Sequence, residues 1–292
     1  MDIPGGTDPL PPRSLGTSGN GRPVRKDEIE LEGGVYVESW YPERRSRRKP
    51  LLFVHGELAG SWLWERWLGY FARRGWEGHA LNLRNHHWST TTDPTTLTFD
   101  SYVDDVAAAI ERLGPNVVVI GHGLGGLLTL AAASRLTVAG LVLLAPEAPA
   151  GVRPPARTHQ LREIPDVYGK ELIGWATLPE KLVRDQRDMS IDDVLRVQHL
   201  LGQKPKESGA ARRTMISGVV IHRERLPDTP RLVVGAGLDG QVPEPIAERL
   251  AVWLGAEYEP FGAHSHYGLV IGESSYLQVA ERVKAFLEAH RL

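Results

Sequence analysis

The chain has 292 residues, of which 41% are hydrophobic, and this length can bury one large core or a core with an inserted lid. The formal net charge of −2 creates no strong field of either sign, so neither nucleic acid nor an anionic membrane is an expected partner. The chain has no cysteine, which excludes disulfides and thiolate metal sites and permits a reducing compartment. We therefore expect a cytoplasmic protein.

The N-terminal segment, residues 1–26, is rich in proline, glycine and serine. It lacks the apolar stretch of a signal peptide, so we expect a disordered leader there and no targeting signal. No apolar run in the chain approaches the ~20 residues that a membrane-spanning helix needs. We therefore expect no membrane span.

Short apolar runs of strand length alternate with segments of helical spacing from residue 28 to residue 146. The expected strands are residues 28–32, 35–42, 51–56, 78–84, 116–121 and 138–146, and the expected helices are 62–75, 101–114 and 124–136. The same alternation resumes with a strand at 231–237, a helix at 243–255, a strand at 256–262 and a helix at 275–290. This order predicts an α/β fold, with a mostly parallel, doubly wound sheet covered by helices on both faces.

Between the two alternating parts, residues 147–228 are helical and rich in loops, with no strong strand pattern. One segment places apolar residues roughly on one helical stripe: Ile191, Val194, Leu195, Val197, Leu200 and Leu201. We therefore expect a core made of residues 27–146 and 229–292, with residues 147–228 inserted as a helical lid. Active sites in such sheets lie beyond the carboxyl ends of the strands, which the lid would cover.

Three features follow one another along the chain at the expected carboxyl ends of strands. The sequence GHGLGG, residues 121–126, joins an apolar strand to an apolar helix, with Gly123 at the tip of the turn. Asp239 follows a later strand in the sequence GLDGQVP, and His266 follows the last strand in PFGAHSHYG. An earlier strand ends in VHG, residues 54–56.

In this order and on these elements, the motifs resemble the α/β-hydrolase family, in particular its serine esterase and lipase members, whose triad runs serine, acid, histidine. The resemblance covers about residues 28–292, and it implies a small-molecule substrate, which we expect to be an apolar acyl ester, with no cofactor or metal. It also implies the following site: Gly123 at the nucleophile position, Asp239 as the orienting acid, His266 as the base, the N–H groups of Glu57 and Leu124 as the oxyanion hole, and Gly121 and Gly125 as the elbow glycines.

Two of these assignments have rivals in the sequence. His264 would serve as the base if the last loop were shifted, although Phe261 and His266 have the spacing that family members show. Glu147 follows the preceding strand and is the alternative acid, although Asp239 has the commoner D-x-x-V-P context.

Other motifs favour less specific interpretations. His55 and His122 are expected to be structural hydrogen-bonding residues near the sheet ends. His86 and His87 are expected on a loop facing the pocket, since no suitably spaced carboxylate suggests a metal site. GHGLGG has the wrong last spacing for a dinucleotide-binding motif.

Gly123 departs from the family pattern because glycine supplies no attacking oxygen, so an acyl-enzyme cannot form at this residue. Three interpretations follow. The chain is a serine hydrolase whose elbow serine has been replaced, and it is impaired in acyl-enzyme chemistry. Alternatively, the pair of His266 and Asp239 acts as a general base on water or on an acidic substrate proton. In the third interpretation the chain binds a small molecule without catalysis.

Overall fold

The structure is a computed structural model that describes residues 24–44, 46–203 and 206–292. Residues 1–23 of the expected leader lie outside the described residues. The first strand, β1, begins at Arg25, so residues 25 and 26 belong to the sheet and not to a leader.

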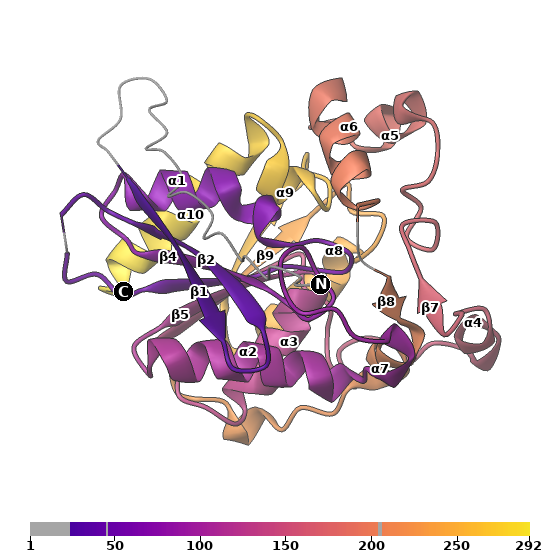
Figure 1. Ribbon diagram of the computed structural model, residues 1–292, viewed down its shortest axis with the longest axis horizontal. Coiled ribbons are helices and arrows are strands. Elements are labelled where there is room, and N and C mark those ends of the chain that lie inside the picture. The colour runs from indigo at the N-terminus through magenta and orange to yellow at the C-terminus, as the bar shows by residue number, and fades with distance from the viewer. Residues whose placement is uncertain (1–23, 45, 204–205) are drawn as a thin grey trace, which may run out of the picture.

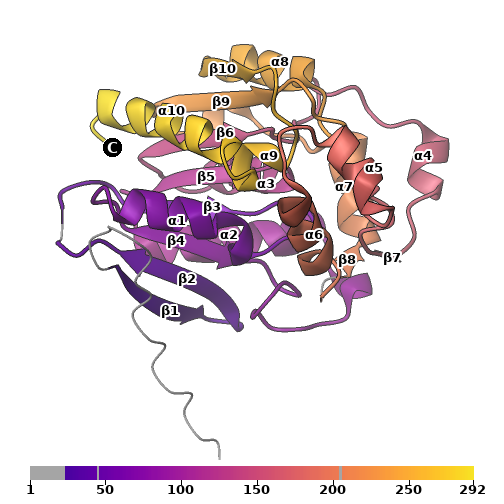
Figure 2. The same ribbon diagram turned by 90° about the horizontal axis from the view of Figure 1, so that it is seen from above.

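The described residues form an eight-stranded sheet in the order β1-β2-β4-β3-β5-β6-β9-β10 (Figure 2). The pairs β1–β2 and β2–β4 are antiparallel, and every other neighbouring pair is parallel. The strands are β1 (Arg25–Leu31), β2 (Val35–Tyr41), β3 (Leu51–Val54), β4 (Gly78–Asn82), β5 (Val118–His122), β6 (Gly140–Leu144), β9 (Arg231–Ala236) and β10 (Glu257–Phe261). The predicted mostly parallel α/β sheet is thus confirmed.

Helices cover both faces of this sheet (Figure 1). On one face lie α1 (Glu65–Ala72), preceded by the 3₁₀ turn Ser61–Trp64, with α9 (Gly268–Ile271) and α10 (Ser275–Ala289). On the other lie α2 (Phe99–Leu113), α3 (Leu124–Ala133) and α8 (Glu244–Leu254). Successive side chains along a strand point to opposite faces of the sheet. The buried apolar residues therefore divide into two clusters, one on each side of the sheet.

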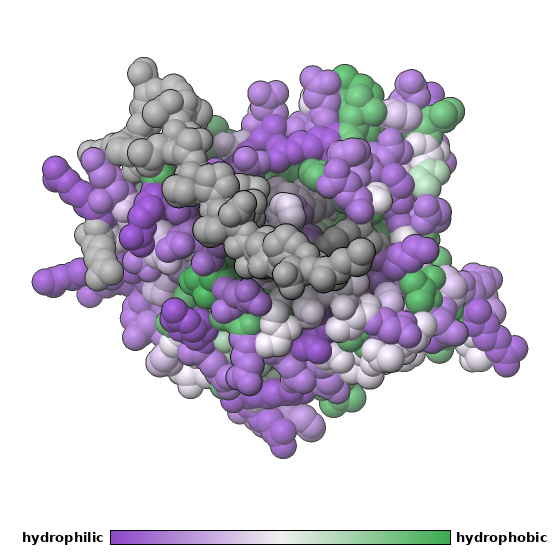
Figure 3. Space-filling model, in the orientation of Figure 1, coloured by the Kyte–Doolittle hydropathy of each residue, from purple (hydrophilic) through white to green (hydrophobic). Residues whose placement is uncertain are grey.

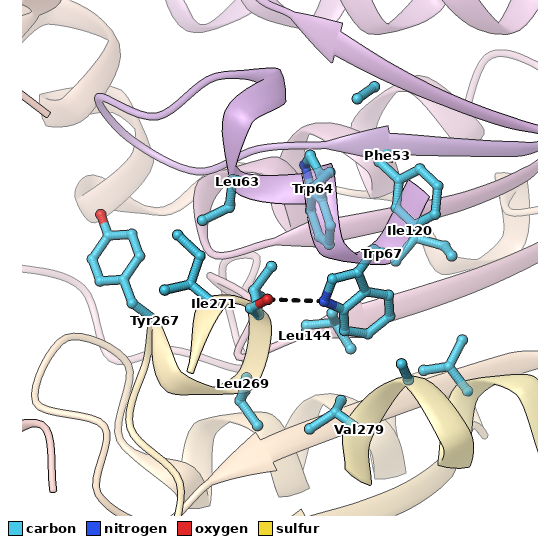
Figure 4. Packing of buried hydrophobic residues seen from close by; sticks show 14 of the residues in the cluster. Phe53, Leu63, Trp64, Trp67, Ile120, Leu144, Tyr267, Leu269, Ile271 and Val279 are labelled. Atoms are coloured by element: carbon cyan, nitrogen blue, oxygen red, sulfur yellow. Dashed lines mark hydrogen bonds between the residues drawn. The ribbon is translucent and has the colours of Figure 1, made fainter. Parts of the chain in front are cut away.

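The cluster under α1 is rich in aromatic side chains (Figure 4). The rings of Phe53 and Trp64 have centroids 5.1 Å apart, and Trp64 and Trp67 meet edge to face at 5.6 Å. The indole Nε1–H of Trp67 donates to the carbonyl of Val270 at 3.0 Å, which ties α1 to α9. Both tryptophans therefore pack in the core; the indole N–H of Trp67 has a partner there, whereas the buried N–H of Trp64 has none among the described residues.

The described residues of the segment 147–228 begin at the carboxyl end of the sheet and return, after Gly218, to the amino end of β9 (Figures 1 and 2). They form α4 (Thr158–Arg162), β7 (Val167–Tyr168), α5 (Pro179–Asp185), α6 (Ile191–Leu200), β8 (Glu207–Ser208), α7 (Gly209–Gly218) and the 3₁₀ turn Arg223–Arg225. The antiparallel pair β7–β8 was not expected from the sequence, because two-residue strands leave no periodic signal. We call this segment the lid.

The apolar stripe predicted for the lid helix α6 is narrower than expected. Val194, Val197 and Leu201 are buried, whereas Ile191 and Leu195 each expose 45% of their surface. Exposed apolar side chains of this kind are scattered in small patches over a mostly hydrophilic surface (Figure 3). None of the helices among the described residues is both long and apolar enough to cross a lipid bilayer.

Candidate active site

The turn between β5 and α3 is a tight bend at the carboxyl end of the sheet. Gly123 at its tip has φ 56° and ψ −123°, a conformation that costs a residue with a side chain about 1–3 kcal/mol. A Cβ on Gly121 or on Gly125 would collide with backbone atoms, so both positions require glycine for the strand and helix to pack this closely. A Cβ on Gly123 would lie 3.1 Å from Nε2 of His266.

The imidazole that faces this bend is held by a carboxylate. Nδ1 of His266 lies 2.7 Å from Oδ2 of Asp239, and the side chains expose 6% and 0% of their surface. The other oxygen of Asp239 accepts the backbone N–H groups of Gln241 and Val242 at 2.7 and 2.9 Å. Because Nδ1–H donates to Asp239, the lone pair of Nε2 is available toward position 123.

The two rival residues have other neighbours. The ring of His264 packs edge to face on Phe261 at 4.9 Å. The carboxylate of Glu147 pairs with Arg153, while its backbone N–H donates to the carbonyl of Gly123 at 2.9 Å. Thus the structure brings together His266, Asp239 and the bend, and it pairs Glu147 with a lid arginine.

Two more histidines belong to the framework of the site. His122 lies under His266, with ring centroids 4.2 Å apart, and its Nε2 is 3.0 Å from the carbonyl of His266. The pKa of His122 lies well below its ordinary value. Burial is the larger cause, and the adjacent His266 is the second. His55 accepts the N–H of Leu83 at 3.1 Å, and burial, followed by His86, lowers the pKa of His55 to about 3. Both rings are therefore neutral hydrogen-bonding groups at neutral pH.

The two predicted oxyanion donors flank the bend. Leu124 begins α3, and the first N–H groups of a helix have no acceptor within the helix. Glu57 follows Gly56, whose Cα would lie 3.9 Å from a Cβ on Gly123. The buried carboxylate of Glu57 pairs with Arg212 and accepts the hydroxyl of Tyr168, both from the lid. The loop after β3 is thus tied to the lid beside the bend.

Sequence reasoning missed a second buried carboxylate at this loop. Glu207, from the lid, accepts the N–H of Leu58 at 2.9 Å, the hydroxyl of Tyr102 at 2.8 Å and Nε2–H of His86 at 2.8 Å. Leu58 has φ 58°, which a leucine rarely adopts, so Glu207 holds the loop in a strained conformation.

The buried side chains of Glu207 and His86 each stabilise the charged form of the other. Burial opposes ionisation of Glu207, but the charge of His86 and the three donated hydrogen bonds outweigh it and lower the pKa of Glu207 to about 2. Burial likewise opposes the charge of His86, and Glu207 outweighs it, so the pKa of His86 is raised. His86 was expected to face the pocket and is instead fully buried. No motif in the sequence pairs it with Glu207, because only the packing of the lid brings them together.

Two cavities adjoin this region in the described part of the chain. One, of about 470 Å³, lies between the lid and α8, and the other, of about 410 Å³, lies beside Leu58 and Trp62. Gly123 and His266 line neither of these two cavities. Within the described residues, no group of three or more histidine, aspartate and glutamate side chains is arranged to hold a metal ion.

With this geometry in hand, the comparisons with known proteins identify the family. Residues 51–282 match the alpha/beta hydrolase family, so the chain belongs to it. The fold is similar to that of a thermophilic esterase from Thermogutta terrifontis, solved with malate bound, with a TM-score of 0.69 and 18% identity over 92% of this chain and 100% of that one.

Two further solved structures show the breadth of this likeness. An esterase from Exiguobacterium antarcticum has a TM-score of 0.69 and 15% identity, covering 89% of this chain and 98% of that one. A bromoperoxidase from Bacillus anthracis has a TM-score of 0.68 and 15% identity, covering 90% and 100%. At such low identity the shared feature is the fold, which hosts different chemistries.

Proposed function

We propose that this chain hydrolyses a carboxylic ester, or a related acyl compound, of a small molecule by general-base catalysis on water, without an acyl-enzyme. The observation that carries the proposal is the position of Nε2 of His266, 3.1 Å from where a Cβ on Gly123 would lie, with Nδ1 hydrogen-bonded to Asp239. A base must lie within hydrogen-bond reach of the proton that it removes, and a water molecule in the place of the missing side chain satisfies that condition.

The reaction needs two proton transfers. Nε2 of His266 takes a proton from water as the water oxygen attacks the carbonyl carbon, and the carbonyl oxygen becomes negative. Asp239 stabilises the imidazolium that forms. When the intermediate collapses, the C–O bond to the leaving group breaks and the leaving oxygen takes the proton from His266. The products are a carboxylic acid and an alcohol.

The negative oxygen is stabilised by the N–H groups of Glu57 and Leu124 on either side of the bend. Donors of this kind each contribute about 2.7–4 kcal/mol to the transition state. Triads that lack a member still retain roughly 10³–10⁴-fold acceleration over water from the remaining parts, so slow turnover by this chain is physically reasonable. The esterases of similar fold support an acyl substrate and do not define which one.

The decisive experiment compares the chain with Gly123→Ser, Gly123→Ala and His266→Ala on a panel of short-chain p-nitrophenyl esters. We expect slow turnover by the unaltered chain, at least 10²-fold less in His266→Ala, and a gain of about 10³-fold in Gly123→Ser, because a serine restores the nucleophile. Gly123→Ala is the matched control, since it adds the same Cβ in the same strained conformation without the hydroxyl.

Mass spectrometry of quenched samples adds an independent readout, since an acyl group should accumulate on Gly123→Ser and not on the unaltered chain. If the serine variant fails to hydrolyse every ester, the acyl chemistry itself is wrong. If His266→Ala retains full turnover, histidine is not the base. If the unaltered chain shows no histidine-dependent turnover while the serine variant is active, the chain is a serine hydrolase that lacks its nucleophile.

A further inference from the structure

The larger cavity contains two arginines that lie close to the candidate active site. Arg153 and Arg212 both line the space of about 470 Å³, and their side chains expose 24% and 20% of their surface. Apolar side chains also line this space, among them Ile164, Leu172, Ile216 and Ile246. We call this space the arginine cavity.

Each arginine is joined to the bend through one carboxylate. Arg212 pairs with Glu57, which adjoins the predicted oxyanion donor, and Arg153 pairs with Glu147, whose N–H donates to the carbonyl of Gly123 at 2.9 Å. Each guanidinium group is thus separated by one carboxylate residue from the bend or from the loop after β3. This link through Glu57 and Glu147 is the connection between the arginine cavity and the candidate active site that the proposal uses.

The cavity offers an anion guanidinium N–H donors that the carboxylate partners of the two arginines leave unused. A guanidinium has five N–H donors, and the described contacts of Arg153 and Arg212 with carboxylates each use one nitrogen. Burial, followed by the nearby charge of Arg212, lowers the pKa of Arg153, so the two cations repel each other. Arg157 also lines the cavity, and Glu163 is a carboxylate on the same wall.

We propose that the arginine cavity binds the carboxylate of the substrate, so that the chain acts on acyl compounds carrying a second, ionised carboxyl group, such as half-esters of short dicarboxylic acids. The proposal rests on the proposed function for its reaction and differs from the apolar ester expected from the sequence. The planar fork of Arg153 or Arg212 matches a carboxylate in a bidentate pair, which a neutral ester cannot form. The apolar wall accommodates the methylene spacer.

The experiment compares monomethyl and dimethyl esters of succinate, glutarate and adipate, so that charge and spacer length vary separately. Turnover is measured for the unaltered chain, Arg153→Gln, Arg212→Gln and Arg213→Gln. Arg213 is the matched control, because it follows Arg212 on α7 and pairs with Asp166. We expect the best half-ester to exceed its diester by at least 10-fold in kcat/KM. Both cavity variants should lower this half-ester to diester ratio by about 10–100-fold, whereas Arg213→Gln should leave the ratio unchanged.

Binding without turnover separates this proposal from the reaction. Titration calorimetry with glutarate should show binding to the unaltered chain and to Arg213→Gln, and none to Arg153→Gln. Equal turnover of half-esters and diesters, or a preference that survives both cavity variants, would overturn the proposal and leave the hydrolysis in place. If no ester is hydrolysed, the proposed function fails, and the calorimetry alone decides: arginine-dependent binding supports the cavity and its absence overturns it.

Discussion

The sheet and the contact between lid and core differ in how far they depend on directional hydrogen bonds. Leu52, Phe53 and Leu143 in the sheet are completely buried among apolar neighbours. Burial of such side chains stabilises without directional requirements, at about 25 cal/mol per Å² of apolar area. The lid adds apolar side chains such as Trp175 and Val194 to the cluster under α1, and it also contacts the core through carboxylates that accept specific hydrogen bonds.

Three lid carboxylates define this contact, which we call the seam: Asp188, Asp193 and Glu207. Asp188 accepts the N–H and hydroxyl of Ser265 at 3.0 and 2.6 Å, directly before His266. Asp193 accepts Arg66 and the N–H of Glu273 at 3.0 and 3.1 Å. Glu207 holds the loop beside the bend.

From this difference we expect that the lid loosens under conditions that leave the sheet folded. Removing one partner of a buried charge pair is costly because the other charge is left unpaired, whereas apolar packing does not depend on a single partner. His266 exposes only 5% of its surface, so a ligand reaches it when lid side chains move.

The largest predicted effect comes from breaking the seam at Glu207. Glu207→Gln keeps the shape but leaves His86 without its carboxylate, so we expect the free energy of lid opening to fall by about 3 kcal/mol. Hydrogen exchange of amides in β8 and α7 measures it. The matched core variant is Leu143→Ala, for which we expect a loss of about 3–5 kcal/mol in global unfolding. The comparison fails if Glu207→Gln lowers global stability as Leu143→Ala does and leaves lid exchange unchanged.

The second-largest expected effect is a pH dependence of the stability that Glu207 and His86 give to the seam. The pKa of Glu207 is depressed from 4.5 to about 2, so its contribution is present above pH 4.5 and lost as pH falls toward 2. The pKa of His86 is raised above 6.5, so its contribution is present below pH 6.5 and lost as pH rises through the raised value. Lid protection should therefore be greatest between pH 4.5 and 6.5. Amide hydrogen exchange of the lid, measured across and beyond this pH range and corrected for intrinsic rates, checks this prediction. The same pH profile of lid protection in Glu207→Gln would contradict it.

The smallest effect is expected at an exposed ion pair outside both regions. Arg135 lies near Asp100 and Asp104 at 2.7 and 3.3 Å, but its side chain exposes 49% of its surface. Solvent weakens such pairs, so Arg135→Ala should change stability by less than about 1 kcal/mol. Denaturant unfolding measures this value. A loss comparable to that of Leu143→Ala would show that surface charges also stabilise the core.

The sequence by itself determined the parts that depend on local pattern. The alternation of strand and helix predicts the sheet, since apolar periodicity and glycine stops act within one element. The predicted bounds of the last helix agree closely with the structure. Helix α10 runs from Ser275 to Ala289, and the sequence predicts a helix over 275–290. The glycines at 121 and 125 indicated the tight bend, because close packing of β5 and α3 leaves no space for a Cβ.

Only the tertiary structure decided which distant side chains meet. The sequence left His264 and Glu147 open beside His266 and Asp239, and the loop geometry, which no periodicity encodes, gave each its neighbour. It carried no signal for Glu207, because the partners of this carboxylate lie more than a hundred residues away along the chain. Directional contacts between segments depend on where the whole chain places them, and a local pattern holds no record of that.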